Sequence, residues 1–343
     1  MNLKELSTRL GLSQTTVSRA LNGYPEVSEK TRRRVQQAAE QFNYAPSVRA
    51  KGLATGKALA IGHVIPTDSK HEMVNPVFSD FIAGAGEVYA SNGYEMLLTV
   101  IDPSTDETTV YENLKSRRAV DGVVVHGPRE NDPRIPLLLD LDLPFVVHGR
   151  STGVTRDYSW LDVNNRRAFE RATDFLFDLG HRRIALVNGT EDKDFAVRRR
   201  AGFVDSHRKH DLTPDPGLMD AQEMTEDYGY RATRRFLDRP DPPTGIVVSS
   251  MISALGVRRA IEEAGLRMGR DISIVTHDDA LSYLRNGADV PIFTATRSSV
   301  REAGSRLAEM LLQIIADPAS QPLTELFEAE LMVGQSTGPA PQS

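Results

Sequence analysis

The spacing of apolar residues divides the chain into two regions. Up to about residue 45 the apolar side chains recur at helical spacing. Leu3, Leu6 and Leu10 share one helix face, and Gly11 follows them where a left-handed turn commonly ends a helix. A second helix opens at Ser13 or Gln14, and a third has Ser28 as its N-cap. We therefore expect three short helices, over about 3–10, 13–21 and 28–43.

From residue 59 onward, apolar runs alternate with amphipathic segments. The runs include "ALAIGHVIP", "YEMLLTVI", "GVVVHG" and "PFVVHG", and later "RRIALVNG", "GIVVSS" and "DISIVTHDD". Buried strands are expected there. Helices are expected between them, over 77–92, 106–117, 133–140, 164–179, 192–209, 226–237 and 250–263. This alternation predicts an α/β fold with two doubly wound parallel sheets and a ligand crevice at the carboxyl ends of the strands.

Composition restricts the class of protein. A chain of 343 residues with 40% hydrophobic content is long enough for two or three domains. The segment "MNLKELSTRL" lacks the apolar centre of a secretory signal, and no apolar run is long enough to span a bilayer, so we expect a cytoplasmic protein. The absence of cysteine excludes disulfides, thiol nucleophiles and thiolate metal sites. No metal or cofactor is expected.

Charge is distributed unevenly along the chain. Residues 1–60 carry ten Lys or Arg and four Glu, a net charge of +6, whereas the whole chain carries −6. A basic head on an acidic body suggests that the head alone binds a polyanion. The alternative for the run "KTRRRV" is a solvated helix face.

The segment "LSQTTVSRALNGY" has a polar face that needs an explanation. Two helices joined by a short turn containing Gly, with a third closing the core, form a helix-turn-helix. The second helix of that motif contacts base edges in the major groove. Gln can pair with adenine, Arg with guanine, and Thr methyl groups with thymine. The alternative is an ordinary surface helix, but exposed Thr is a poor helix former.

Residues 3–56 resemble the headpiece of the LacI/GalR family of transcriptional regulators. The matching positions are Thr16-Val17-Ser18-Arg19, Asn22, Val27-Ser28, Thr31-Arg32, Val35 and Asn43-Tyr44-Ala45-Pro46. The resemblance implies that Gln14 and Thr15 read bases and that Arg19 makes a further base contact. It also implies phosphate contacts, mostly from Ser13, Thr16, Ser18, Asn22 and Thr31.

Residues 46–58 form a short basic segment after Pro46. The resemblance implies a hinge helix, ordered by DNA, in which Leu53 inserts into the minor groove. An apolar wedge can lever base steps apart because the bent DNA then contacts more protein. The alternative is a flexible linker.

The rest of the chain resembles the periplasmic-binding-protein-like effector domain of the same family. The resemblance implies an N-subdomain of about 59–162 and 291–323 and a C-subdomain of about 163–290 and 324–338. Polar residues near the strand ends are the candidates for effector contact: His148, Arg150, Arg199, Ser250 and Asp278. Asp278 is the strongest, as a carboxylate that accepts two sugar hydroxyls and faces Arg199. Its alternative role is to cap a following helix, and that of Arg199 is a solvated surface position.

Enzymatic patterns are weak. "GRSTG", residues 149–153, fits the G-x-S-x-G of a serine hydrolase, but the sequence after it reads as loop and strand where the hydrolase needs a helix. "HEMVN" lacks the second His of a zinc protease. The missing signal peptide and the basic head argue against a protein that only binds sugar. No catalytic residue is assigned.

The sequence therefore predicts a homodimeric repressor that reads a pseudo-palindromic operator in double-stranded DNA and responds to a small sugar. The headpiece and "PFVVHGR" most resemble regulators of α-glucoside utilisation operons in α-proteobacteria, which implies an α-glucoside effector. A non-sugar effector and a corepressor remain the alternatives.

Overall fold

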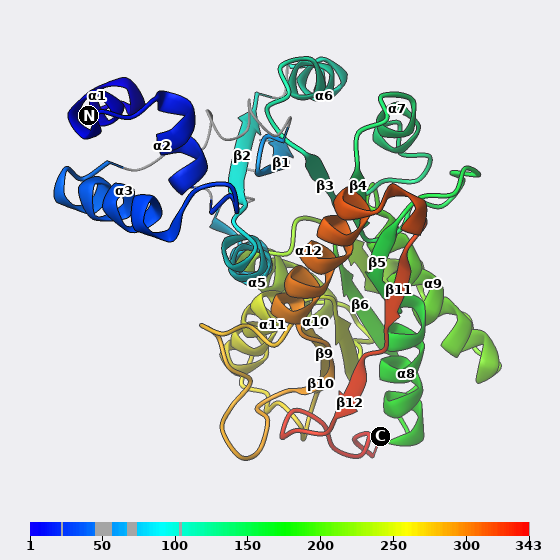
Figure 1. Cartoon of the computed structure of the whole chain (residues 1–343). Coiled ribbons are helices and arrows are strands. Elements are labelled where there is room, and N and C mark those ends of the chain that lie inside the picture. Colours follow the sequence, from blue (N-terminus) through cyan, green and yellow to red (C-terminus); the bar gives the residue numbers. More distant parts are fainter. Residues whose placement is uncertain (22, 45–56, 67–73, 103–104, 343) are drawn as a thin grey trace. The chain divides into compact units, whose positions relative to one another are not determined.

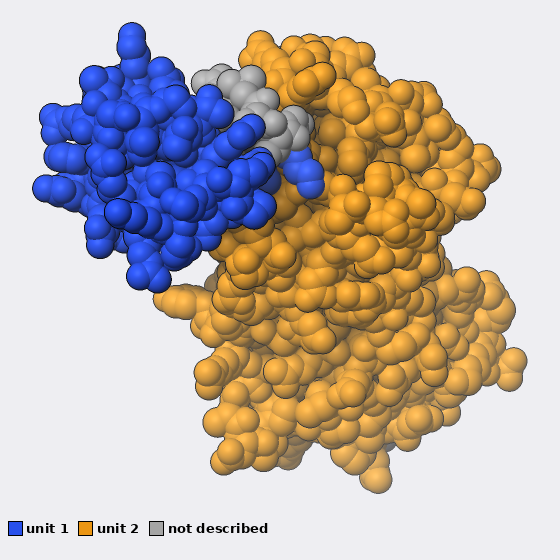
Figure 2. Space-filling view, in the orientation of Figure 1, with its two compact units in different colours: residues 1–59 blue, residues 60–343 orange. Residues whose placement is uncertain are grey.

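The computed structural model describes residues 1–21, 23–44, 57–66, 74–102 and 105–342. The chain divides into two compact units, residues 1–59 and residues 60–343 (Figures 1 and 2). Each unit has its own hydrophobic core.

The smaller unit contains the three expected helices, α1 (Leu3–Leu10), α2 (Gln14–Leu21) and α3 (Glu29–Gln41). Asn2 and Glu5 form a capping box at the start of α1, and Gly11 ends it with φ of 64°. The Ser28 side chain accepts a hydrogen bond from the Thr31 N–H and caps α3. The core is formed by Leu6, Leu10, Val17, Ala20, Val27, Val35, Ala38 and Ala39.

The larger unit contains two six-stranded sheets. The first is entirely parallel, in the order β11-β5-β4-β3-β1-β2. Its strands are β1 (Ala60–Pro66), β2 (Glu95–Ile101), β3 (Gly122–His126), β4 (Phe145–His148), β5 (Trp160–Val163) and β11 (Thr324–Phe327). We call this sheet and its helices the N-subdomain.

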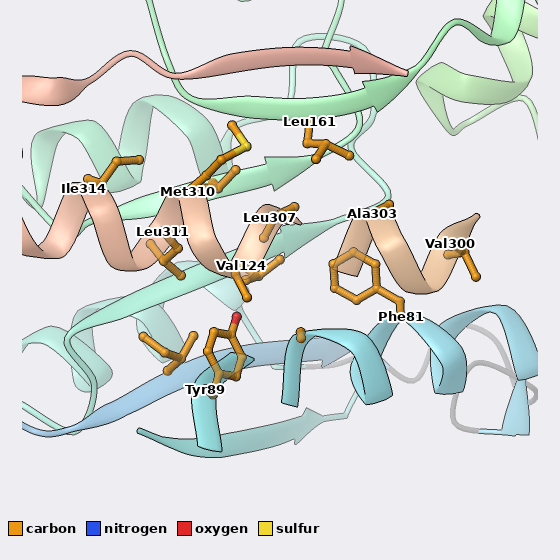
Figure 3. Close-up of a cluster of buried hydrophobic side chains, with 14 of the residues drawn as sticks. Phe81, Tyr89, Val124, Leu161, Val300, Ala303, Leu307, Met310, Leu311 and Ile314 are labelled. Atoms are coloured by element: carbon orange, nitrogen blue, oxygen red, sulfur yellow. The ribbon is translucent and has the colours of Figure 1, made fainter. Parts of the chain in front are cut away.

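Helices cover both faces of the first sheet. They are α5 (Pro76–Ser91), α6 (Glu107–Ser116), α7 (Arg134–Asp140) and α12 (Val300–Ala316). A short 3₁₀ helix, η3 (Pro318–Ser320), follows α12. On one face α5 and α12 pack together, and Phe81 and Tyr89 meet Leu307 and Leu311 there (Figure 3). On the other face Tyr111 of α6 and residues of α7 pack on the sheet. Coverage of both faces explains the continuous valine runs in β3 and β4.

The second sheet has the order β12-β10-β9-β8-β6-β7, and only the pairing of β12 with β10 is antiparallel. Its strands are β6 (Ile184–Asn188), β7 (Met219–Ala221), β8 (Gly245–Val248), β9 (Ser273–Asp278), β10 (Thr294–Arg297) and β12 (Glu330–Met332). Around it lie α8 (Asn165–Asp178), α9 (Asp194–Lys209), α10 (Glu226–Leu237) and α11 (Met251–Glu263), with the 3₁₀ helix η2 (Pro216–Leu218) before β7. We call this sheet and its helices the C-subdomain. The prediction of two parallel doubly wound sheets is confirmed, apart from the antiparallel edge strand.

Two of the three predicted crossings between the subdomains are wrong by several residues. The first lies near residue 164, as expected from 162. The second lies at 298–299 instead of 290, because β10 belongs to the second sheet. The third lies at 328–329 instead of 323, because β11 belongs to the first sheet. Both strands are only four residues long, and their sheet is decided by hydrogen bonds that a short sequence pattern does not encode.

In the described part of the chain, no helix is long and apolar enough to cross a membrane.

Candidate functional site

The exposed N-terminal end of α2 carries the residues predicted to read DNA. The Ser13 hydroxyl accepts a hydrogen bond from the Thr16 N–H at 3.0 Å and so caps the helix. Gln14, Thr15 and Arg19 are exposed, while Val17 and Ala20 turn into the core. The helix thus presents polar side chains and its positive dipole end to solvent, an arrangement suited to a polyanion.

The predicted phosphate contacts differ in their surroundings. The hydroxyls of Thr16 and Thr31 are each 2.8 Å from the hydroxyl of their N-cap serine, Ser13 or Ser28. Ser18 is partly buried. Asn22 and Leu53 lie outside the described residues, as does most of the predicted hinge segment.

A cavity of about 960 Å³ lies within the larger unit and is lined by residues of both subdomains. It includes the ends of β3, β4, β8 and β9, where the sequence placed the ligand crevice. Four of the five predicted effector residues line it: His148, Arg150, Arg199 and Ser250.

Arg199, on α9, is buried and held in place by neutral groups. Its Nε donates to Asn165 Oδ1 at 2.7 Å, and Nη1 donates to the Ser249 carbonyl at 2.6 Å. Burial lowers the pKa of this guanidinium to about 10, while the charges of Asp279 and Asp162 raise it. It remains charged at neutral pH. The structure excludes the solvated surface role.

The predicted carboxylate, Asp278, and its neighbour Asp279 have different surroundings. Asp279 lines the cavity, whereas Asp278 does not. Asp278 Oδ1 accepts a hydrogen bond from the Ala280 N–H at 2.8 Å, and Oδ2 lies 3.9 Å from Arg297 Nε. No helix follows that it could cap. Successive strand residues point to opposite faces, which accounts for the different surroundings of the two aspartates.

Asp279 is electrostatically unusual. Burial raises the pKa of its carboxyl to about 6, opposed by the Arg199 charge and assisted by Asp278. His277 Nε2 lies 3.6 Å from Asp279 Oδ1. Burial and the Arg199 charge hold the pKa of that imidazole well below its ordinary value, so the contact is not an ion pair at neutral pH.

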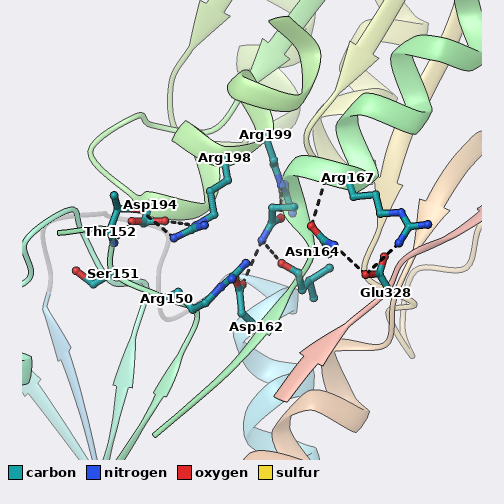
Figure 4. Close-up of polar contacts among 12 residues, drawn as sticks. Arg150, Ser151, Thr152, Asp162, Asn164, Arg167, Asp194, Arg198, Arg199 and Glu328 are labelled. Atoms are coloured by element: carbon teal, nitrogen blue, oxygen red, sulfur yellow. Dashed lines mark hydrogen bonds and ion pairs between the residues drawn. The ribbon is translucent and has the colours of Figure 1, made fainter. Parts of the chain in front are cut away.

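Arg150 and Ser250 are already engaged within the protein. Arg150 Nε donates to Asp162 Oδ2 at 2.8 Å (Figure 4). Its guanidinium lies over the Trp160 ring, 4.9 Å from the centroid. The Ser250 hydroxyl accepts a hydrogen bond from the Ile252 N–H at 3.1 Å and caps α11. Its own O–H can still donate to a ligand.

The hydrolase pattern has no catalytic geometry. Residues 149–158 contain no helix, as the sequence argument required. The Ser151 hydroxyl donates to the Arg129 carbonyl at 2.6 Å and accepts from the Asp132 N–H at 3.0 Å. Its hydrogen bonds therefore fix a loop.

Sequence reasoning missed Asp279, Asn165 and His126, all of which line the cavity. Strand alternation in "SIVTHDD" could have favoured the second aspartate over the first. "GVVVHG" and "PFVVHG" both end in His-Gly, yet only the second histidine, His148, was considered. Nothing in the sequence marks Asn165.

Two family models match the chain. One, described as "Bacterial regulatory proteins, lacI family", matches residues 2–47, and another, "Periplasmic binding protein-like domain", matches residues 173–337. The HTH-type transcriptional regulator AglR of Rhizobium meliloti (strain 1021) is 46% identical over 342 residues, which cover 99% of this chain and 95% of AglR. The chain belongs to the LacI family of bacterial regulatory proteins. It is a helix-turn-helix transcriptional regulator.

Solved structures agree with this assignment over nearly the whole chain. The lac repressor dimer bound to operator and the anti-inducer ONPF has a TM-score of 0.85 at 25% identity, with 98% of this chain and 99% of that chain covered. The transcriptional regulator CelR in complex with cellobiose has a TM-score of 0.72 at 26% identity, with the same coverage.

In this LacI-family regulator, direct contacts join the subdomains beside the cavity. Asp194, at the start of α9, accepts a hydrogen bond from the Thr152 N–H and forms an ion pair with Arg198 (Figure 4). Arg198 Nη2 donates to the Thr152 hydroxyl at 2.9 Å, and the Asp194 N–H donates to the Pro128 carbonyl at 3.0 Å. We call Asp194, Arg198 and Thr152 the latch.

Proposed function

We propose that the protein is a dimeric repressor of a carbohydrate-utilisation operon and acts on DNA in the cytoplasm. Two copies of α2 would read the half-sites of a pseudo-palindromic operator, because a two-fold protein matches a two-fold site. The exposed Gln14 and Thr15 would contact bases, with Arg19 as a further base contact. Ser13, Thr16, Ser18, Asn22 and Thr31 would contact phosphates mostly, and Leu53 would insert into the minor groove.

The effector we propose is a small sugar, and the observation that carries this is that Arg199 and Asp279 line the same cavity and interact electrostatically. A guanidinium that donates and a carboxylate that accepts can bind adjacent hydroxyls of one sugar ring. The similarity to CelR, solved with cellobiose, supports the sugar class. The resemblance to regulators of α-glucoside operons narrows it to an α-glucoside.

Effector binding would alter operator binding through the angle between the subdomains. A ligand that contacts both cavity walls favours one angle, and the segment before residue 60 joins the N-subdomain directly. Linkage requires that operator binding and effector binding alter each other by the same factor. A change in the angle between the subdomains would break or form the contacts of the latch.

The test is operator binding by the purified protein at fixed salt, with DNA from its own upstream region, because affinities for DNA depend steeply on salt. The panel contains monosaccharides, disaccharides and sugar phosphates. A compound that lowers the affinity supports a repressor with an inducer. A compound that raises it means a corepressor, and no response to any saccharide contradicts the sugar effector.

A further inference from the structure

The N-subdomain wall of the cavity carries histidine and phenylalanine side chains whose presence Arg199 and Asp279 do not explain. His126 and His148 end the neighbouring strands β3 and β4, and both line the cavity with Phe78 and Phe81 of α5. A cavity of about 960 Å³ lies near the upper end of the range for drug-sized ligands, so one sugar ring would leave much of it unfilled.

The rings of this wall support one another. Phe81 stacks on His148 with centroids 4.3 Å apart, and meets His126 edge to face at 5.1 Å. Phe78 meets His126 at 5.4 Å. Such contacts fix ring orientation, so the two imidazoles stand in defined positions before a ligand arrives.

Both imidazoles are neutral. Burial lowers the pKa of His148 to about 4, and burial together with the neighbouring histidines and Arg134 keeps the pKa of His126 well below its ordinary value. A neutral imidazole offers one N–H donor and one acceptor. Among the described residues the His148 imidazole has no hydrogen-bond partner, and the His126 imidazole has one, His63.

His63 sets which nitrogen of His126 carries the proton. His63 Nδ1 lies 2.9 Å from His126 Nε2, and His63 Nε2 is buried without a partner. If His126 donated, the single proton of neutral His63 would sit on Nε2 as a buried N–H without an acceptor, which proteins rarely tolerate. His63 therefore donates, and His126 keeps its proton on Nδ1, which remains available to the cavity.

The cavity disfavours an anion. Nine acidic and five basic side chains line it. The cations other than Arg199 have carboxylate partners within 4.0 Å: Arg129 and Lys193 pair with Asp192, Arg134 with Asp132, and Arg150 with Asp162. Arg199 interacts electrostatically with Asp279 and Asp162. A phosphate or carboxylate on the ligand would lack a free cation and would face excess negative charge.

We propose that His126 and His148 form a second sugar subsite that takes an uncharged ring, with His63 as the residue that positions the His126 N–H. The effector is then an uncharged glycoside of at least two rings, one at Arg199 and Asp279 and the other at the histidine wall. This inference rests on the proposed sugar effector and specifies its size and charge.

The experiment measures ligand binding directly on the full-length protein, by calorimetry and by the fluorescence of Trp160, the chain's single tryptophan. The probes are methyl α-D-glucopyranoside, maltose, trehalose, sucrose and trehalose 6-phosphate. We expect at least one of the disaccharides to bind at least tenfold more tightly than the monosaccharide, and the phosphate ester to bind more weakly than trehalose. Equal affinities of mono- and disaccharide, or tighter binding of the phosphate, would overturn the proposal.

Variants locate the subsite. His126→Phe keeps the ring and removes the N–H, and we expect it to weaken the preferred disaccharide about tenfold while the monosaccharide changes less than twofold. Equal loss of both sugars contradicts the subsite. His210→Phe is the matched control, because His210 pairs with Asp174 and does not line the cavity.

The role of His63 has its own readout. Asn can place a donor where His63 Nδ1 lies, whereas Leu cannot. We expect His63→Asn to retain disaccharide affinity within about threefold and His63→Leu to lose it, with ¹⁵N shifts reporting the proton on His126 Nδ1 in the wild type and in His63→Asn. A proton on Nε2 in the wild type rules out the positioning role.

Operator binding separates the two proposals. If a disaccharide binds through His126 but leaves operator affinity unchanged, the subsite stands and the regulatory coupling fails. If the operator is bound specifically but no saccharide binds, the subsite and the sugar effector both fall.

Discussion

The carboxylate of Asp194 accepts a hydrogen bond from the backbone N–H of Thr152 at 2.5 Å, which joins α9 of the C-subdomain to the loop after β4 of the N-subdomain. Asp194 is 1% exposed, and its other oxygen pairs with Arg198. Pro128 and Lys193 beside this contact both line the cavity. Protein groups thus join the two subdomains at the cavity wall.

Asp194→Ala should favour the open arrangement. A buried, charge-assisted hydrogen bond contributes about 1.5–3 kcal/mol, so we expect effector affinity to fall at least about tenfold as the closed population falls. Hydrogen exchange of the Thr152 amide should accelerate. Asp205→Ala is the control on the same helix, because Asp205 pairs with Arg166 and Arg208 inside the C-subdomain. Similar behaviour of the two variants would exclude the latch.

Asp279→Asn should raise the free energy of unfolding at neutral pH and weaken effector binding. Burial raises the pKa of Asp279 from 3.8 to about 6. The folded protein therefore binds the proton of the Asp279 carboxyl more tightly than the unfolded chain does. That stabilisation is complete below about pH 4 and is lost as pH rises through 6. At pH 7.5 the neutral Asn should therefore raise the unfolding free energy by up to roughly 2 kcal/mol, with no gain near pH 4.

The same variant should bind the effector at least about tenfold more weakly at pH 7.5, since Asn offers one acceptor oxygen and no charge. Wild-type affinity should itself fall as pH drops below about 6. Thermal melts and calorimetry at three pH values measure both effects. Unchanged effector affinity with intact operator binding would remove Asp279 from the site.

The sequence was most informative where one physical requirement determines the residue type. Helical spacing with Gly11 and Ser28 at helix ends predicted α1 to α3, and buried valine runs predicted β3 and β4. It was least informative where a role depends on assembly. The short strands β10 and β11 could not be assigned to a sheet, and α12 was not predicted at all.

The same distinction applies to the cavity. Arg199 and His148 were predicted, because strand ends and the family pattern mark their positions. Asp279 lines the cavity and the predicted Asp278 does not, because successive strand residues point to opposite faces. The contact of His63 with His126 joins residues 63 positions apart, and no local pattern indicates it.

Exchanging Gln14 and Thr15 should change the preferred operator sequence and leave nonspecific DNA affinity nearly unchanged. Both side chains are exposed at the start of α2, where base contacts carry about 1–3 kcal/mol of discrimination each. Selection from a randomised operator library at fixed salt measures the preference. Gln37→Ala, on the exposed face of α3, is the control. An unchanged preference after the exchange would contradict the assignment of these two residues as base readers.

Gly84→Ala and Gly86→Ala should have opposite effects on stability, although both lie in α5. A Cβ on Gly84 would lie 2.1 Å from the Arg301 carbonyl oxygen of α12, whereas on Gly86 its nearest neighbour is Met96 Cε at 3.6 Å. The first forces the two packed helices apart and should cost about 1–3 kcal/mol or more, and the second should gain roughly 0.5–1 kcal/mol by restricting the unfolded chain. Urea unfolding of both variants measures this difference. Equal stabilities would mean that α5 and α12 do not require the close backbone approach that Gly84 permits.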